Sequence, residues 1–465
     1  SNQQSAKDSN MRLKQSILVG VISLSGLTAC GDSSSDSIPD VSLGGDNQLY
    51  SLNNKAIINS NLITIKQNLE TQGVEVWALN LESKKDVMLF DLKNADDYQD
   101  TNFTYSIGKR IRTDNDFYFD IKAVNKDADY SSQNYSHRWV TKGAPSDTEF
   151  LFQSQSSGAE AYSEEFSLSD RYIRFSSIMS FPYRLFAHTR EQIKEGNDYG
   201  FEQYDVLTRS NNQLYFTASD EWNGQKSLYQ TVGQWADTIK IIDLEADMSI
   251  GHLSVNKTIY FTESNYGADS ENLYHYNNTD NSKEFVGEFD KVLALKESDK
   301  ETLYVVTFES ENAEFFLWIG EKGLPLVDKL PLQGEVNQDS VITLGDTLIL
   351  SMNNKTWAVN KESFSLQEIH DAGLNGVNDG FVEHQGLLYF ISTSEEHGQE
   401  LWRTDGTKVG TRLVKDIKSG ASGSNISNLT SEYGYLTFFA DDGVNGKEVW
   451  MLNNQTLEVE LLTDN

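Results

Sequence analysis

The sequence predicts an all-β protein: a β-propeller of about eight four-stranded blades, with seven to nine allowed, after a signal peptide and a flexible tether. Three observations predict it. A short strand, a polar loop and a second strand ending in an aromatic residue recur along the 465 residues. The period of about 45 residues has room for four strands but not for a crossover helix. The repeated strands are apolar on both faces, so each must be covered on both sides.

The first of these observations is a regular spacing. Tyr172, Tyr215, Tyr260, Tyr304 and Ile349 mark the centres of successive strands and follow one another at steps of 43, 45, 44 and 45 residues. In a chain with 11% aromatic residues a single match means nothing, but a series of nearly equal steps indicates a repeat. The spacing therefore predicts one structural unit per period.

The second strand of each unit ends at an aromatic residue. These partners are Trp77, Trp139, Phe186, Tyr229, Tyr274, Trp318, Trp357, Trp402 and Trp450. The unit around Tyr118 has the longest internal loop and is the first candidate for a false count, so we expect eight blades. We also expect the strand near Leu49 and Tyr50 to pair with the C-terminal strand, which would close the ring and remove two exposed edges.

The N-terminal region has the features of an export signal. Arg12 and Lys14 precede an apolar run over residues 17–27, which is too short to span a bilayer. The run ends in Leu27-Thr28-Ala29-Cys30, which resembles the lipobox of bacterial lipoproteins. That resemblance implies cleavage before Cys30 and lipidation of this residue; the other interpretation is an ordinary signal peptide. The predicted segments are 1–29 (signal peptide and upstream residues), 30–47 (lipidated cysteine and tether) and 48–465 (propeller).

A second resemblance lies near the C-terminus. Residues 400–407 read ELWRTDGT, and Glu448-Val449-Trp450 repeats the first half of this stretch. These residues resemble the bacterial ELWxxDGT repeat family, often described as hyalin-like. The resemblance implies a propeller and says little about function.

Composition excludes several classes of function. The chain carries 70 acidic and 38 basic side chains, a net charge of −32, so nucleic acid is not an expected partner. The single cysteine excludes a disulfide scaffold. The one specific partner that the sequence predicts is the membrane, through the lipid anchor at Cys30.

Metal and cofactor sites have weak support. None of the seven histidines forms a closely spaced pair typical of a metal site, and we expect no cofactor. The calcium candidates are Asp127 and Asp129 in one turn and Asp441 and Asn445 in another, where oxygen ligands alternate along the chain. Neither turn completes a calcium-binding loop, and solvated acidic turns are the favoured explanation of both stretches.

No local motif for catalysis appears in the sequence, so no catalytic residue is predicted. We therefore expect a non-catalytic lipoprotein of the bacterial cell envelope, facing the periplasm or the cell surface. Its propeller would act as a binding or scaffolding module for a protein or glycan partner. The alternative is a glycan-active propeller enzyme that works in its central funnel.

Overall fold

The computed structural model describes residues 41–462 with gaps. The gaps are 44–48, 69–72, 93–97, 99, 101, 127–133, 157–162, 169–170, 177–183, 189–192, 195–202, 211–212, 220–223, 233–236, 246–247, 266, 323–325, 327 and 375–379. Within residues 41–54 and 154–204, only the backbone of the described strands is considered. The described residues form nine antiparallel sheets, eight with four strands and one with five, which we call blades 1 to 9 in chain order.

Blades 1 to 3 are built from thirteen strands, whose bounds follow. Blade 1 contains β1 (Val41–Leu43), β2 (Leu49–Ile58), β3 (Asn61–Asn68), β4 (Val74–Asn80) and β5 (Lys85–Asp91). Blade 2 contains β6 (Phe103–Arg112), β7 (Phe117–Asn125), β8 (Asn134–Thr141) and β9 (Glu149–Ser156), with the 3₁₀ turn η4 (Pro145–Asp147) before β9. Blade 3 contains β10 (Ser163–Leu168), β11 (Arg171–Ser176), β12 (Arg184–His188) and β13 (Ile193–Lys194).

Blades 4 to 6 follow the same order of four strands. Blade 4 contains β14 (Gln203–Ser210), β15 (Gln213–Ser219), β16 (Ser227–Thr231) and β17 (Ile239–Asp243). Blade 5 contains β18 (Met248–Val255), β19 (Ile259–Asn265), β20 (Glu271–Asn277) and β21 (Ser282–Phe289). Blade 6 contains β22 (Lys291–Glu297), β23 (Thr302–Glu309), β24 (Glu314–Glu321) and β25 (Asp328–Leu332).

Blades 7 to 9 complete the chain. Blade 7 contains β26 (Val336–Leu344), β27 (Thr347–Met352), β28 (Lys355–Asn360) and β29 (Ser365–His370). Blade 8 contains β30 (Phe381–His384), β31 (Leu387–Ser394), β32 (Gly398–Thr404) and β33 (Arg412–Lys415). Blade 9 contains β34 (Ser427–Glu432), β35 (Tyr435–Asp441), β36 (Lys447–Asn453) and β37 (Glu458–Leu461).

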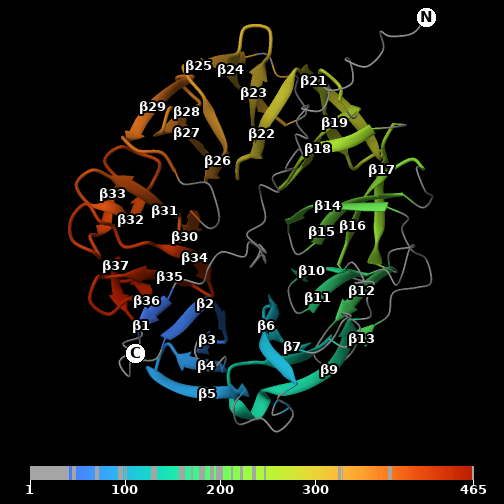
Figure 1. The fold of residues 1–465 in the computed structure, drawn as a ribbon. Helices are drawn as coiled ribbons and strands as arrows, with labels where there is room; N and C mark the ends of the chain where they lie inside the picture. The colour runs from blue at the N-terminus through green and yellow to red at the C-terminus, as the bar shows by residue number, and fades with distance from the viewer. Residues whose placement is uncertain are drawn as a thin grey trace, which may run out of the picture.

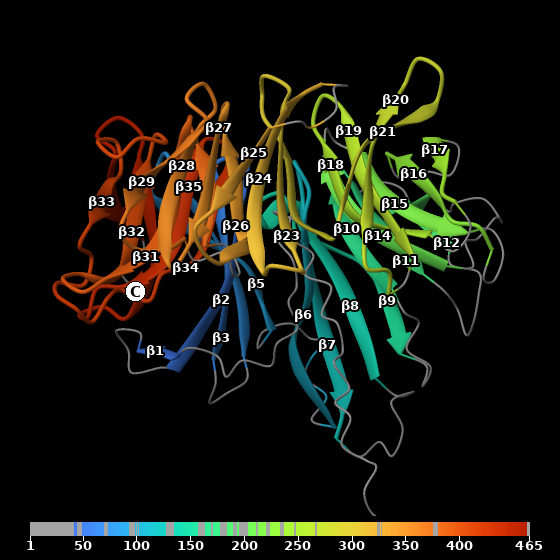
Figure 2. The same ribbon diagram turned by 90° about the horizontal axis from the view of Figure 1, so that it is seen from above.

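The blades stand around one axis in chain order, so the predicted β-propeller is confirmed (Figure 1). In blades 2 to 9 the first strand lies nearest the axis and the fourth on the rim (Figure 1). First strands of consecutive blades contact one another, as β18 contacts β22 and β22 contacts β26. The view turned by 90° shows the long strands of blade 2 extending past those of the other blades on one side (Figure 2).

The second strand of each blade supplies the centre of the core. Tyr118, Tyr260, Tyr304 and Tyr389 are among the largest fully buried side chains, together with phenylalanines at the following position such as Phe390. Adjacent residues of a strand point to opposite faces, so burial of both means that both faces are covered. Stacking between blades meets this need, and the repeated apolar strands were a correct signal for it.

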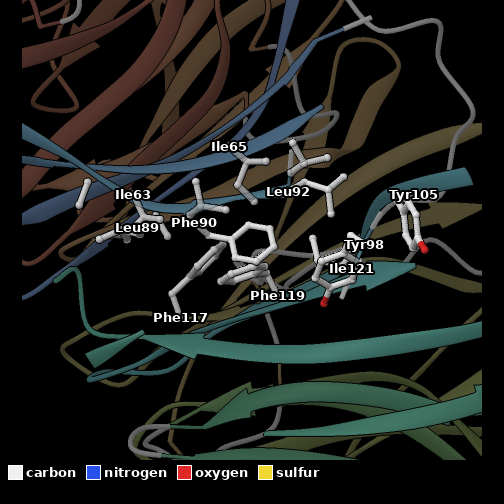
Figure 3. Packing of buried hydrophobic residues seen from close by; sticks show 14 of the residues in the cluster. Ile63, Ile65, Leu89, Phe90, Leu92, Tyr98, Tyr105, Phe117, Phe119 and Ile121 are labelled. Carbon is white, nitrogen blue, oxygen red and sulfur yellow. The ribbon is translucent and has the colours of Figure 1, made fainter. Parts of the chain in front are cut away.

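The largest apolar cluster among the described residues lies between blades 1 and 2. Ile63 and Ile65 of β3 meet Phe117, Phe119 and Ile121 of β7, as Figure 3 shows. No single four-stranded sheet could bury these side chains alone. The packing between neighbouring sheets is therefore the main source of stability.

The blade number lies at the upper end of the predicted range. The unit around Tyr118, the first candidate for a false count, is the complete blade 2. Its long internal loop includes residues 127–133, which lie outside the described part. The length of that loop did not prevent the flanking strands β7 and β8 from pairing over seven residues.

The prediction that the strand at Leu49 and Tyr50 pairs with the C-terminal strand is wrong. Strand β2 pairs with β1 and β3 inside blade 1, and β1 falls within residues 30–47, the predicted tether. The ring is closed by side chains: an apolar cluster joins Ile57 and Leu62 of blade 1 to Phe439 and Val449 of blade 9. Packing at this seam takes the place of a shared strand.

Residues 398–402 read GQELW, residues 446–450 repeat the pattern as GKEVW, and the first copy connects one blade to the next. Glu400 is fully buried, and it accepts hydrogen bonds from the Ser424 hydroxyl at 2.8 Å and the Lys418 backbone N–H at 3.2 Å. Gly398 has a φ of +65°, and a Cβ there would lie 2.3 Å from the backbone nitrogen of Gly423. The motif therefore holds the segment that leads from blade 8 into blade 9.

The Asp-Gly-Thr half of the motif is a turn that closes on itself. Asp405 accepts hydrogen bonds from the backbone N–H and the hydroxyl of Thr407, at 2.9 and 2.6 Å, and the Thr407 hydroxyl lowers the pKa of this carboxyl. Thr404 and Thr411 join their hydroxyls at 2.7 Å across the turn. Thr-x-Gly-x₄-Thr also occurs at 141–148 and 231–238, with threonine hydroxyls 2.8 and 3.0 Å apart.

Glu400 gives a prediction for the pH dependence of stability. Burial raises the pKa of Glu400 in the folded protein. Its contribution to the free energy of unfolding is therefore complete below the unfolded pKa of about 4.3, and it is lost as pH rises through the folded pKa. The variant Glu400→Gln lacks this loss. We expect its free energy of unfolding, relative to the parent protein, to increase between pH 4.5 and pH 7.5 in urea titrations; an unchanged difference would contradict this.

Candidate functional site

One face of the ring carries the turns between the first and second strands, and polar side chains of these turns join neighbouring blades. The hydroxyl of Ser210 donates to the carbonyl of Val255 at 2.7 Å, which links blades 4 and 5. Glu297 accepts from the backbone N–H of Thr258 at 3.2 Å, and the Ser298 hydroxyl donates to Asp346 at 2.6 Å. This face therefore holds buried polar groups close to the axis.

Side chains from blades 9, 1 and 2 meet at the inner end of this face. The buried Lys55 donates to the hydroxyl of Thr430 at 2.6 Å and to the carbonyl of Thr437 at 3.1 Å. Glu432 accepts from the backbone N–H of Ile57 at 2.9 Å, and its other oxygen lies 3.1 Å from Nε of Arg112. Because Arg112 belongs to blade 2 and Glu432 to blade 9, this ion pair joins the two blades on either side of blade 1.

Blade 8 contributes a histidine on the other face of β34. His384 is the last residue of β30 and is only 3% exposed. Its Nδ1 lies 2.8 Å from the hydroxyl of Ser431 in blade 9, and its Nε2 lies 2.8 Å from Oδ1 of Asn454 in the same blade. We call Lys55, Arg112, His384, Thr430, Ser431, Glu432 and Asn454 the axial cluster.

The hydrogen bonds fix the tautomer of His384. The amide nitrogen of Asn454 donates to the carbonyl of Gly434 at 2.7 Å, and a carbonyl can only accept. Oδ1 of Asn454 therefore faces the ring and accepts the proton of Nε2. In the neutral ring Nδ1 then carries no proton and accepts the hydroxyl proton of Ser431, which is the arrangement of a general base next to a nucleophile.

Ser431 itself is half-buried and lies on β34, the strand of blade 9 nearest the axis (Figure 1). The turn that follows is Tyr433-Gly434, with φ values of +50° and +79° that tight hairpins require. Tyr433 is 43% exposed, and the Arg112 guanidinium lies 5.8 Å from the centre of its ring. Ser431 therefore stands between a buried base and an exposed aromatic turn.

A second serine–histidine contact differs in its surroundings. Nε2 of His370 lies 3.1 Å from the hydroxyl of Ser392, and Nδ1 lies 3.6 Å from Asp371. Ser392 is only 2% exposed, and its hydroxyl also has the carbonyl of Gly373 as an acceptor at 3.3 Å. Burial lowers the pKa of His370. This contact lies inside the packing of blades 7 and 8, where a substrate cannot approach the hydroxyl.

The sequence-predicted site residues are not brought together. Cys30, Asp127 and Asp129 lie outside the described residues. Asp441 accepts hydrogen bonds from the backbone of Gly443 at 2.7 Å and from Lys418 at 2.9 Å, and the amide of Asn445 donates to Asp442 at 2.9 Å. Within the described part of the chain, no three His, Cys, Asp or Glu side chains are grouped to hold a metal ion.

Sequence analysis missed His384, Ser431 and Asn454, because 47 residues separate the first two and 70 the first and third. The repeats offer no signal that singles these residues out. The last paired residue of a first strand is polar not only at His384 and Glu432 but also at Arg112, Ser210 and Glu297.

Comparison with known proteins gives structural matches alone. No protein-family model matches the chain, and no curated protein matches it. Among solved structures it is similar to oligopeptidase B from Leishmania major, with a TM-score of 0.39 and 8% identity over 87% of this chain and 53% of that one. It is also similar to prolyl oligopeptidase B from Galerina marginata, with a TM-score of 0.37 and 10% identity over 75% and 57%.

A third similar structure is Saccharomyces cerevisiae Sqt1, with a TM-score of 0.36 and 10% identity over 81% of this chain and 95% of that one. The chain spans little more than half the length of the two peptidases. Peptidases recur among the similar structures, and this finding contradicts two of our predictions. One is the non-catalytic binding or scaffolding module, with its glycan-active alternative. The other is the prediction that the chain is not an enzyme.

Among the residues that the structure describes, no helix is long and apolar enough to cross a membrane.

Proposed function

We propose that this chain is an enzyme of the bacterial cell envelope that uses His384 as a general base in the axial cluster. One observation carries the proposal: Asn454 fixes the Nε2–H tautomer, so the basic Nδ1 faces the hydroxyl of Ser431 at 2.8 Å. A positioned base of this kind contributes roughly 10²- to 10⁴-fold to a reaction rate. The low exposure of the ring, 3%, shields the proton transfer from bulk water.

The experiment compares the parent protein with His384→Gln on a mixture of small molecules and peptides extracted from bacterial envelopes. Mass spectrometry before and after incubation reports every compound that is consumed or formed. We expect conversion by the parent protein and at least about a hundredfold slower conversion by the variant. His397→Gln is the matched control, because His397 is half-buried in blade 8 and bonds Asp416 instead. Equal conversion by the parent and His384→Gln would overturn the proposal.

The envelope location rests on the first thirty residues. The apolar run over residues 17–27 ends in Leu27-Thr28-Ala29-Cys30, and Cys30 is the sole cysteine of the chain. Acyl chains on Cys30 would contribute about 0.8 kcal/mol per buried CH₂ to membrane binding. Strand β1 begins at Val41, eleven residues later, so the intervening chain can reach at most about 40 Å from the anchor.

Lipidation of Cys30 can be tested by labelling growing bacteria with an alkyne analogue of palmitate. We expect the label on the full-length protein, with the protein in the membrane fraction. Cys30→Ser is expected to lose the label and to leave the membrane fraction. Ser33→Ala, three residues further on, serves as the control and should behave like the parent. Label retained on Cys30→Ser would refute the anchor.

A further inference from the structure

We propose that Ser431 is a nucleophile and that the reaction is acyl transfer: hydrolysis of uncharged or cationic carboxylic esters or amides. The inference rests on the proposed role of His384 as a general base and adds the attacking atom and the class of substrate. Three contacts define the arrangement. The Ser431 hydroxyl lies 2.8 Å from Nδ1, Nε2 lies 2.8 Å from Asn454, and Asn454 lies 2.7 Å from the carbonyl of Gly434.

The third member is an amide, which limits what it can do. Asn454 holds the ring in the tautomer that can accept the serine proton, but it offers no full negative charge to the imidazolium. Its own orientation is fixed by Gly434 in the turn after β34, so the positioning group and the nucleophile belong to one blade. Asn454 is therefore a positioning residue, and His384 and Ser431 are the catalytic pair.

The chemical step balances without a cofactor. The Ser431 oxygen forms a bond to the carbonyl carbon of the substrate while its proton passes to Nδ1 of His384. The bond from that carbon to the leaving oxygen or nitrogen breaks, and the imidazolium returns the proton to the leaving group. Water then repeats the two transfers, which releases the carboxylic acid and restores the serine hydroxyl.

The charges near Ser431 select the substrate class. Phosphoryl transfer needs cations to stabilise the negative charge of its transition state. The cations of the axial cluster are already engaged, since Arg112 faces Glu432 at 3.1 Å and Lys55 donates to Thr430 at 2.6 Å. The chain as a whole carries a net charge of −32 and repels anionic substrates. An uncharged or cationic acyl compound meets neither obstacle.

The buried pair Ser392 and His370 provides an internal comparison. Both serines contact a histidine nitrogen, at 2.8 Å for Ser431 and 3.1 Å for Ser392. Ser392 is 2% exposed, whereas Ser431 is half-buried on the strand nearest the axis. Reaction with an external acyl donor or an acyl-directed probe should therefore distinguish the two serines.

The test uses a fluorophosphonate probe on the purified full-length chain, followed by mass spectrometry of peptides. We expect the label on Ser431, none on Ser392, and loss of the label in Ser431→Ala. His384→Gln should label at least about a hundredfold more slowly. Ser427→Ala is the matched control, because Ser427 is also half-buried on β34, and it should label like the parent.

Asn454→Ala separates positioning from a purely structural role. We expect slower labelling and a shifted pH profile of labelling; a variant that merely loosens the turn would lower the unfolding temperature without shifting the pH profile. Absence of label from Ser431 in a chain with unchanged thermal unfolding would overturn the inference. If envelope compounds were still converted in a His384-dependent way, the general base would stand and only the nucleophile would be wrong.

Discussion

Replacing Asp120 by alanine is expected to lower the free energy of unfolding by about 3–5 kcal/mol, because it removes the carboxylate that faces a buried guanidinium. Asp120 on β7 lies directly opposite Arg138 on β8, and their side chains are only 9% and 5% exposed. Two nitrogens of Arg138, Nε and Nη2, donate to the two carboxylate oxygens, the latter at 2.9 Å. Urea unfolding followed by tryptophan fluorescence measures the loss.

A double replacement separates the ion pair from the packing. Asp120→Leu combined with Arg138→Met removes both charges and keeps most of the volume, and we expect it to recover most of the stability lost in Asp120→Ala. Lys240→Ala is the control for an exposed pair: Lys240 and Asp243 are each about half exposed, and their separation should cost little. A loss below about 1 kcal/mol for Asp120→Ala would contradict the account.

Phe119→Ala is expected to lower the free energy of unfolding by about 3–5 kcal/mol, because it removes a fully buried ring and leaves a cavity. Phe119 lies in the cluster between blades 1 and 2, with its ring 5.8 Å from that of Phe90 across the blade boundary (Figure 3). Thermal and urea unfolding measure the effect. If the blades held together independently of this packing, the change would be small.

The matched control is Phe285→Ala. Phe285 lies on β21, the rim strand of blade 5, and is 59% exposed. Its removal creates no cavity, so we expect a change within about 0.5 kcal/mol. A large effect at Phe285 together with a small one at Phe119 would mean that the core between blades is not where stability resides.

Spacing in the sequence was enough to predict the blade cores. Tyr215, Tyr260 and Tyr304 recur at nearly equal steps, and all three are buried on the second strands of blades 4, 5 and 6. The reason is physical: each blade must offer the same apolar faces to its neighbours. Periodicity in such a chain reports packing directly.

The count of blades and the closure of the ring were harder to predict. The unit around Tyr118 looked irregular because loop length varies freely while strand pairing does not. Closure at the seam depends on Lys55, Ile57 and Glu432 meeting across the ends of the chain. No local pattern states which edges meet, so the expected pairing of the strand at Leu49 was wrong.

The axial cluster could not be predicted from local motifs. His384, Ser431 and Asn454 each lie at a strand end or turn, and none belongs to a sequence signature of a hydrolase. Stacking of blade 8 on blade 9 brings them together. The motifs that did attract attention in the sequence, around Glu400 and Asp405, turned out to hold loops and turns in place.

The tautomer of His384 tests the central claim most directly. Nitrogen-15 labelling of the histidines and long-range proton–nitrogen correlation identify the tautomer, and loss of the signal in His384→Gln assigns it. We predict that the neutral ring carries its proton on Nε2 and that the unprotonated Nδ1 accepts from Ser431. A neutral ring with its proton on Nδ1 would contradict the account.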